Sequence, residues 1–168
     1  SIAGNSDPIG KVDSMWTLPN GLRIGKRRVP LGVVGIIYEA RPNVTADAAA
    51  LCLMTGNACV LRGGKEAINS NIAISDIMRD AIAKAGLPAD CITLVTDTTR
   101  ESSMQMMKAN GLIDVLIPRG SAGLISAVVE NATVPVIETG IGICHTYVDE
   151  GADLNTALDI VENAKCSR

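Results

Sequence analysis

Polar and charged residues gather in four short clusters along the chain, and each cluster directly follows a run of apolar residues. The clusters comprise residues 39–43, 62–65, 119–121 and 138–145. In an open α/β sheet, ligands bind in a crevice outside the carboxyl ends of the parallel strands. If the apolar runs form such strands, the clusters meet at one sheet edge and predict a crevice for a phosphorylated or anionic ligand.

The third cluster combines a cation with the start of an expected helix. Gly120 and Ser121 follow Arg119, so glycine lets backbone amides approach a phosphate and the helix N-terminus favours negative charge. The alternative is a Gly-Ser helix cap that binds no ligand. The dinucleotide fingerprint GxGxxG is absent after the first expected strand of the sheet, which argues against an ordinary dehydrogenase Rossmann site.

The second cluster offers two cations on a permissive backbone, in the order Arg62, Gly63, Gly64 and Lys65. Such a segment is suited to a ribose phosphate, and its alternative is a turn with solvated charges.

The last cluster holds a carboxylate, a thiol and an imidazole within eight residues, from Glu138 to His145. A Cys-His pair would suggest a nucleophile with its base. Neighbours in an extended segment point to opposite faces, however, so we expect no hydrogen bond between Cys144 and His145. Cys144 is therefore expected to be structural, and His145 to be a capping donor or a substrate contact.

The elements that must position these clusters alternate between strand and helix. An Asn-Gly turn at residues 20–21 predicts a β-hairpin over residues 16–29. The further expected strands are residues 33–38, 58–61, 91–95, 115–118, 134–137 and a shorter one at 146–149, and the expected helices are residues 47–54, 69–85, 101–109, 122–130 and 154–164. This alternation predicts an α/β fold with a doubly wound, mostly parallel, Rossmann-like sheet and an N-terminal β-hairpin.

The composition excludes several classes of protein for this chain. Hydrophobic residues make up 47% of the 168 residues, while aromatic residues are 2% and phenylalanine is absent, so the core must be aliphatic, as suits helices packed on a parallel sheet. A net charge of −3, with a single basic cluster at residues 26–28, predicts no nucleic-acid partner. No long apolar run or signal peptide is evident, which predicts a cytoplasmic protein without a membrane partner.

The five cysteines are widely spaced, as expected for reduced thiols without a metal site.

Four segments carry a resemblance to a known family. They read VPLGVVGIIYEARPNVTADAAALCLMTGNACVLRGGKEAINSN, IDVLIPRGSAGLI, VPVIETGIGICHTYVDEGADL and ENAKCSR. Their order and spacing resemble the gamma-glutamyl phosphate reductase family, also called glutamate-5-semialdehyde dehydrogenase, of the aldehyde dehydrogenase superfamily. The resemblance covers nearly the whole chain. It implies a fold of the aldehyde dehydrogenase type and NADPH-dependent reduction of L-glutamyl 5-phosphate to L-glutamate 5-semialdehyde, with phosphate release, in proline biosynthesis.

The resemblance also implies roles for individual residues. Residues 38–43 line the active-site tunnel, and Ile125 stands where the superfamily's phosphate-binding motif normally has glycine. The resemblance places Arg62 at the adenine ribose, Gly120 and Ser121 at the pyrophosphate, and Glu138 at a glutamate that acts as a base or nicotinamide gate. Together with the four clusters, this predicts cofactor contacts by Arg62, Gly63, Gly64 and Lys65 at the ribose phosphate, by Gly120 and Ser121 at the pyrophosphate, and by Glu138, Thr139 and Gly140 at the nicotinamide. Arg41, Asn43 and His145 are the candidates for the charged groups of the substrate.

The family's nucleophilic cysteine lies in a PSxCNA-like segment shortly after an NAK-x-x-R element, which here is residues 163–168. The nucleophile is therefore expected after Arg168, and Cys166 occupies a variable position before it. Glu138 is the one candidate for a catalytic base in the chain. The expected organisation is a fragment with an N-terminal segment and hairpin arm at 1–30, an NADP-binding domain at 31–168, and no catalytic domain.

Two alternatives share these motifs. One is the reductase half of a bifunctional delta-1-pyrroline-5-carboxylate synthase that also carries glutamate kinase activity, and the other is a stand-alone nucleotide-binding module. The resemblance further implies a homo-oligomer for the full-length protein and glutamate 5-kinase as a partner.

Overall fold

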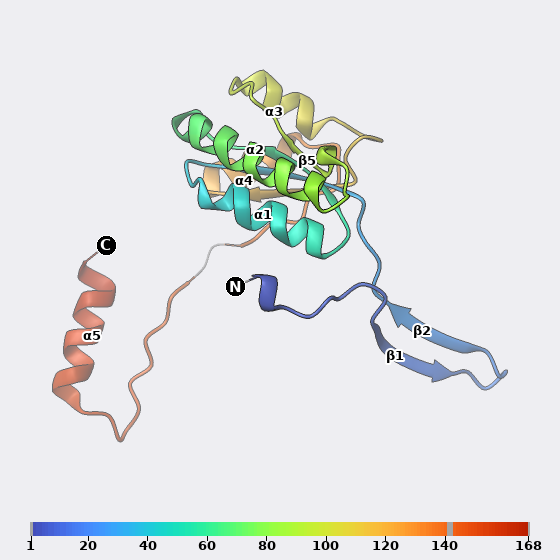
Figure 1. The fold of residues 1–168 in the computed structure, drawn as a ribbon. Coiled ribbons are helices and arrows are strands. Elements are labelled where there is room, and N and C mark those ends of the chain that lie inside the picture. The colour runs from blue at the N-terminus through green and yellow to red at the C-terminus, as the bar shows by residue number, and fades with distance from the viewer. Residues whose placement is uncertain (1, 141–142, 168) are drawn as a thin grey trace.

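The computed structural model describes residues 2–140 and 143–167, and the centre of the fold is a parallel sheet (Figure 1). Its strands lie in the order β5-β4-β3-β6. Their bounds are β3 Val33–Tyr38, β4 Ala58–Arg62, β5 Ile92–Leu94 and β6 Val115–Arg119. Strand β3 is buried from Val34 to Tyr38, because a parallel strand with helices on both faces has no solvent-facing side.

The register of the sheet brings three of the polar clusters to one edge. Tyr38, the last residue of β3, pairs with Arg119, the last residue of β6, and Ile37 pairs with Arg62, the last residue of β4. The clusters that begin at residues 39, 62 and 119 therefore leave the sheet side by side, as predicted.

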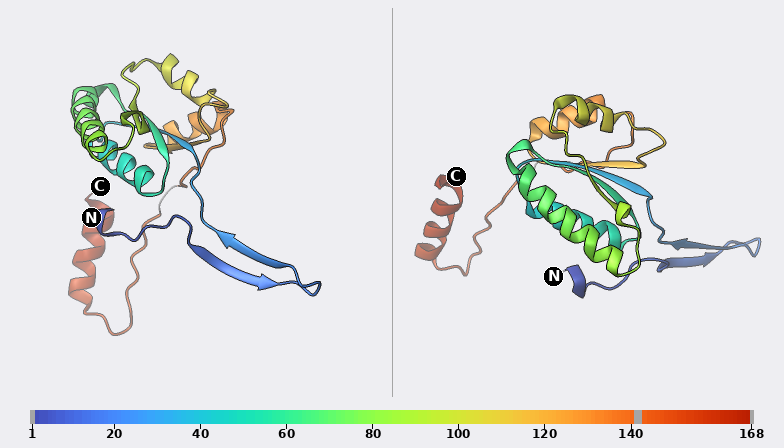
Figure 2. Two further views of the ribbon diagram at one scale, coloured as in Figure 1. Left: turned by 45° about the vertical axis from the view of Figure 1, so that its right-hand side comes forward. Right: turned by 45° about the horizontal axis from the view of Figure 1, so that its top comes forward.

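Helices cover both faces of the sheet, which confirms the doubly wound arrangement. One core joins Ala49 and Cys52 of α1 (Asn43–Met54) to Ile36 and Leu61 of the sheet, with α2 (Ile68–Lys84) packed against it. A second core lies on the opposite face and joins Ile37 and Leu116 to the helices α3 (Arg100–Met107) and α4 (Ala122–Asn131). Figure 2 shows the two pairs of helices on opposite sides of the strands.

Helix α1 begins at Asn43, four residues before the expected start at residue 47. Pro42 precedes it with φ −61° and ψ −28°. Because the proline ring fixes φ near the helical value, the chain turns into the helix directly after the polar cluster. Asn43 is thereby placed in the first turn of a helix.

The predicted hairpin is confirmed as two antiparallel strands, β1 (Val12–Thr17) and β2 (Arg23–Arg27). The turn is closed by a hydrogen bond from the Leu18 amide to the Leu22 carbonyl at 2.8 Å, and Gly21 has φ +85°. The hairpin extends away from the sheet (Figure 1). Met15 and Trp16 are 58% and 42% exposed, so the hairpin contributes little to the core.

The expected strand at residues 134–137 is wrong, since the chain makes only an isolated bridge between Val136 and Leu116. Leu116 donates to the Pro135 carbonyl and accepts from the Ile137 amide, both at 2.8 Å. Pro118 lies two residues further along β6 and faces the same side. Because proline has no N–H, it cannot donate the next bond of the ladder, and the pairing stops after one residue.

The expected strand at residues 146–149 is also wrong, because this segment forms no regular structure. Tyr147 is 85% exposed, and the sheet ends before reaching the segment. The last helix is confirmed as α5 (Leu154–Cys166), which has no buried residues and lies apart from the sheet in both figures (Figures 1 and 2). Within the described ranges no helix is long and apolar enough to cross a bilayer.

Candidate functional site

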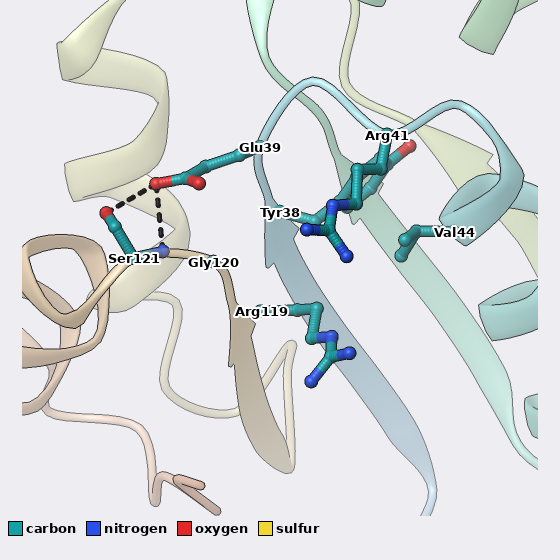
Figure 3. Close-up of a pocket in the computed structure, with 7 residues that line it drawn as sticks. All are labelled: Tyr38, Glu39, Arg41, Val44, Arg119, Gly120 and Ser121. Carbon is teal, nitrogen blue, oxygen red and sulfur yellow. Dashed lines mark hydrogen bonds between the residues drawn. The ribbon is translucent and has the colours of Figure 1, made fainter. Parts of the chain in front are cut away.

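A cavity of about 340 Å³ opens at the carboxyl ends of β3 and β6 (Figure 3). The chain moves outward from β3 to β4 and β5 and then returns to β6 on the other side, so this is the point where the strand order reverses. Doubly wound sheets bind ligands at such a switch point. The lining residues are Tyr38, Glu39, Arg41, Val44, Arg119, Gly120 and Ser121.

Backbone hydrogen bonds fix the loop that carries the first polar cluster. The Glu39 amide continues the sheet ladder by donating to the Arg119 carbonyl at 3.3 Å. The Arg41 amide then donates to the Glu39 carbonyl at 2.8 Å, and the Val44 amide donates to the Arg41 carbonyl at 3.0 Å. The loop is thus tied to β6 at its start and to α1 at its end, with the Arg41 side chain presented to the cavity.

The opposite wall of the cavity is the beginning of α4. Ser121 has φ −65° and ψ 159°, and its hydroxyl accepts a hydrogen bond from the Leu124 amide, as an N-cap residue does. Gly120 precedes it, and a Cβ atom there would lie 2.7 Å from Cδ of Glu39. A glycine is therefore required for the close approach of the Glu39 side chain.

Glu39 binds directly to the N-cap residue. Its Oε1 accepts a hydrogen bond from the Ser121 hydroxyl at 2.6 Å and another from the Ser121 amide at 3.0 Å (Figure 3). These bonds, the hydroxyl bond foremost, hold the pKa of the Glu39 carboxyl below its usual value, with a smaller contribution from the charge of Arg41. Glu39 is therefore an anion seated at a helix N-terminus, where negative charge is favoured.

Two guanidinium groups face the same cavity from the other side. Arg41 and Arg119 are both exposed, and Figure 3 shows their side chains directed into the same space. Neither belongs to a salt bridge among the residues that the structure describes. A guanidinium carries donors in a planar fork that matches carboxylate and phosphate groups. The cavity is thus equipped to bind an anionic ligand.

The cluster that follows β4 is built differently, because its arginine is engaged with the protein. The Arg62 guanidinium donates to the carbonyls of Thr98 and Thr99 at 2.7 and 2.9 Å, and to that of Gly63 at 3.2 Å. Arg62 therefore holds the loop between β5 and α3. Lys65 is exposed at the start of a short 3-10 helix, η2 (Lys65–Ala67), and remains accessible to a ligand.

A buried polar network supports the cavity from below. The Tyr38 hydroxyl lies 2.6 Å from Oγ1 of Thr45, which donates to Oδ1 of Asn71 at 3.0 Å. Because the single Thr45 proton goes to Asn71, the Tyr38 hydroxyl is the donor to Thr45. Burial raises the pKa of Tyr38. The network fastens the end of β3 to α1 and α2, and Gly63 packs against Asn71 and Tyr38 without room for a side chain.

The structure brings only some of the predicted site residues together. Arg41, Gly120 and Ser121 line one cavity. Asn43 is exposed, and its amide donates to Asp47 at 3.4 Å instead of entering that cavity. The remaining predicted residues outside the second cluster are exposed and do not line the cavity: Glu138, Thr139, Gly140 and His145. Their cofactor and substrate roles stay predictions.

Sequence reasoning assigned no separate role to Glu39 or Arg119, although both lie in the predicted clusters. The pairing of Tyr38 with Arg119 brings them together, so the signal was the register of two strands distant in sequence. No group of three or more histidine, cysteine, aspartate or glutamate residues that could hold a metal ion occurs within the described part of the chain.

Comparisons with known proteins agree with the arrangement. The profile of the aldehyde dehydrogenase family matches residues 6–168. The chain is similar to the gamma-glutamyl phosphate reductase of Clostridium perfringens (strain SM101 / Type A), with 67% identity over 162 residues that cover 96% of this chain and 39% of the relative. It is similar to the enzyme of the same name from Thermoanaerobacter sp. (strain X514), with 60% identity over 167 residues that cover 99% of this chain and 40% of the relative.

Among solved structures, the crystal structure of gamma-glutamyl phosphate reductase from Thermotoga maritima matches with a TM-score of 0.85 and 46% identity. The match covers 99% of this chain and 40% of that chain. The 168 residues therefore span 39 to 40% of the length of these relatives.

Proposed function

The chain belongs to the aldehyde dehydrogenase family, and we propose that it provides the cofactor-binding part of a gamma-glutamyl phosphate reductase. The family resemblance seen in the sequence is confirmed, as is the fold of the aldehyde dehydrogenase type. The proposed reaction is the NADPH-dependent reduction of L-glutamyl 5-phosphate to L-glutamate 5-semialdehyde with release of phosphate.

One observation carries this proposal: the cavity at the switch point of the sheet joins a glycine-serine helix start to two arginines without salt bridges in the described chain. A dinucleotide cofactor and an acyl phosphate are both multiply charged anions. The Arg41 and Arg119 guanidinium groups and the N-terminus of α4 are the groups that bind such charges. Four further cavities of the described residues do not combine two arginines with a helix N-terminus.

The residues present fit the phosphates of NADPH. Gly120 lacks a Cβ, so a phosphate can reach the Ser121 amide and hydroxyl from the cavity once Glu39, to which both now donate, has moved away. In the proposal, Gly120 and Ser121 hold the pyrophosphate and Arg119 adds a cation beside it. When bound, the cofactor supplies the hydride of the reduction.

Lys65 is the proposed contact for the phosphate on the adenine ribose, which distinguishes NADPH from NADH. It is exposed and close in sequence to the end of β4, and its side chain forms no salt bridge among the described residues. Arg62 is proposed to act at the same corner mainly by holding the loop that follows β5, since its terminal Nη2 donates to the carbonyls of Thr98 and Thr99. Glu138, Thr139 and Gly140 are proposed to approach the nicotinamide from the segment after Val136.

Arg41 is the proposed partner of the substrate's phosphate or carboxylate, because its guanidinium faces the cavity. Asn43 and His145 are proposed as further substrate contacts. The protein's role in these steps is to bind and orient charged groups. The acyl phosphate itself would be supplied by a glutamate kinase, and we propose glutamate 5-kinase as a partner on that ground.

The nucleophilic thiol of the reaction is proposed to lie outside these residues. Cys52 and Cys59 are buried in the core between α1 and the sheet, and the neighbouring Cys52 thiol, together with burial, raises the pKa of Cys59. Cys91, Cys144 and Cys166 do not line the cavity. A catalytic thiol must reach the reacting carbonyl in a substrate-sized site, and the described cysteines lack that placement.

The hairpin is proposed to serve assembly of a homo-oligomer. A two-stranded sheet is marginal in isolation, and both strands of this hairpin are largely exposed, including Met15 and Trp16. Pairing with a second copy would bury this surface.

Calorimetric titration of NADPH into the wild-type protein, Arg119→Ala and Ser121→Ala tests the proposal. Each variant removes a charge-assisted donor, for which we expect a loss of affinity of roughly tenfold. Arg23→Ala removes the same charge from the exposed hairpin and serves as the control. Unchanged NADPH affinity in both cavity variants would contradict the assignment of the site. A parallel titration of NADH, with Lys65→Ala, tests whether the ribose phosphate is bound as proposed.

A further inference from the structure

We infer that Glu39 sets the affinity of the phosphate site, because its carboxylate takes the place at Ser121 that a diphosphate oxygen of the cofactor would take. This inference rests on the proposed function, since it requires a cofactor phosphate bound at Gly120 and Ser121. It goes beyond that function by assigning an opposing role to an acidic residue of the same cavity.

The Ser121 hydroxyl and amide cannot donate to Glu39 and to a phosphate oxygen at the same time. One oxygen of Glu39 receives both the hydroxyl proton, at 2.6 Å, and the amide proton, at 3.0 Å. A serine hydroxyl has one proton to donate, and its lone pairs here face the Leu124 amide as a helix cap. A phosphate oxygen can therefore receive these protons only after Glu39 has released them.

The packing at Gly120 leads to the same conclusion. A Cβ atom at Gly120 would lie 2.7 Å from Cδ and 2.8 Å from Cγ of Glu39. The carboxylate thus lies against the glycine backbone, in the space through which a diphosphate would approach it. Figure 3 shows Glu39 reaching across to Ser121, while Arg41 and Arg119 extend toward the other part of the cavity.

Among the described residues, the Glu39 carboxylate makes hydrogen bonds only to Ser121. The Glu39 side chain is exposed, so its rotation into solvent requires mainly the loss of these two hydrogen bonds. Rotation also removes a negative charge from the path of a negatively charged ligand. The two arginines and the N-terminus of α4 then remain as an uncompensated cationic surface.

The opposite role, in which Glu39 only holds Ser121 in a productive position, predicts the reverse effect of substitution. Removal of a competitor tightens ligand binding, whereas removal of a positioning residue weakens it. The sign of the change in affinity therefore decides between the two roles.

The experiment is calorimetric titration of NADPH and of inorganic pyrophosphate into the wild-type protein, Glu39→Gln and Glu39→Ala. We expect both variants to bind both probes roughly tenfold more tightly, which corresponds to about 1.4 kcal/mol. Glu130→Gln removes the same charge from the exposed far end of α4 and should leave both affinities unchanged. Far-UV circular dichroism and thermal unfolding verify that each variant is folded.

Two outcomes overturn the inference. One is unchanged or weaker binding of both probes in the two Glu39 variants. The other is tightening of undiminished size when Glu39→Gln is combined with Ser121→Ala, because direct competition for Ser121 requires the two effects to be non-additive. Tighter pyrophosphate binding without NADPH binding in any variant would support the role of Glu39 at an anion site and overturn the proposed function instead.

Discussion

Thr45 is the central link of the buried network beneath the cavity, and Thr45→Val should destabilise the protein by about 2–6 kcal/mol. Valine has nearly the shape of threonine, so packing is retained while the hydroxyl is lost. The Tyr38 hydroxyl then has no acceptor and Oδ1 of Asn71 has no donor, and all three side chains are buried. Each buried polar group left without a partner costs about 1–3 kcal/mol.

Asn71 makes the stability of the protein especially sensitive to the loss of the Thr45 hydroxyl. Its Nδ2 is already without a partner in the structure, so the substitution leaves the whole buried amide unpaired. Tyr38→Phe removes one hydroxyl but keeps the bond between Thr45 and Asn71, and should cost only about 1 kcal/mol. The expected order of stability is therefore wild type, Tyr38→Phe, Thr45→Val.

Urea unfolding followed by far-UV circular dichroism measures these differences. Tryptophan fluorescence is less suitable, since Trp16 lies on the exposed hairpin. Thr156→Val is the matched control, because Thr156 is the third residue of α5 as Thr45 is the third residue of α1, but is exposed. If Thr45→Val is no more destabilising than Tyr38→Phe or the control, the buried network does not support the cavity as described.

Three further substitutions address the core, the site and the loop beside it. Gly35→Ala should lower the free energy of unfolding by about 1–3 kcal/mol, since its Cβ would lie 2.6 Å from a Leu116 methyl in the second core; urea unfolding tests this, and wild-type stability would show that the core accommodates the methyl. The folded-state pKa of Glu39 is depressed, so its contribution to stability is present above the unfolded-state pKa and is lost as pH falls through the lower folded value. Thermal midpoints measured from about pH 5 to 3 should therefore fall less steeply in Glu39→Gln than in wild type, and parallel curves would refute this. In Arg62→Lys, a single ammonium group replaces the guanidinium and cannot donate to all three carbonyls. Amide hydrogen exchange should therefore become faster at residues 95–99, and unchanged protection would show that other contacts hold the loop.

The strand-helix pattern of the sheet was predictable because its causes are local. Runs of aliphatic residues predicted the bounds of β3 and β4 to within one residue, and the Asn-Gly turn predicted the hairpin. The strand at 134–137 failed because its pairing depends on Pro118, in a different strand, which cannot donate at the required position. Hydrophobic pattern identifies a segment suited to a sheet, but not whether its neighbour can pair with it.

The site was predictable in outline and not in its internal contacts. Polar clusters at strand ends located the cavity, because parallel strands deliver their carboxyl ends to one edge. The hydrogen-bond partners of individual side chains depend on three-dimensional packing and could not be predicted from the sequence. Arg62 is an example, because its guanidinium donates to the carbonyls of Thr98 and Thr99. Glu39 was likewise grouped with the cluster, but its contact with Ser121 requires two segments 82 residues apart in sequence.

That separation has a consequence for the order of folding. The unit from β3 through β5 is made of neighbouring segments, which can associate early because short loops close at little entropic cost. The bonds from Glu39 to Ser121, and the bond from the Val33 amide to Asp114 across 81 residues, form only once β6 has docked against β3. The cavity therefore has no precursor in the first half of the sheet, and we expect anion binding during refolding to appear only with this last pairing, later than most of the helical signal.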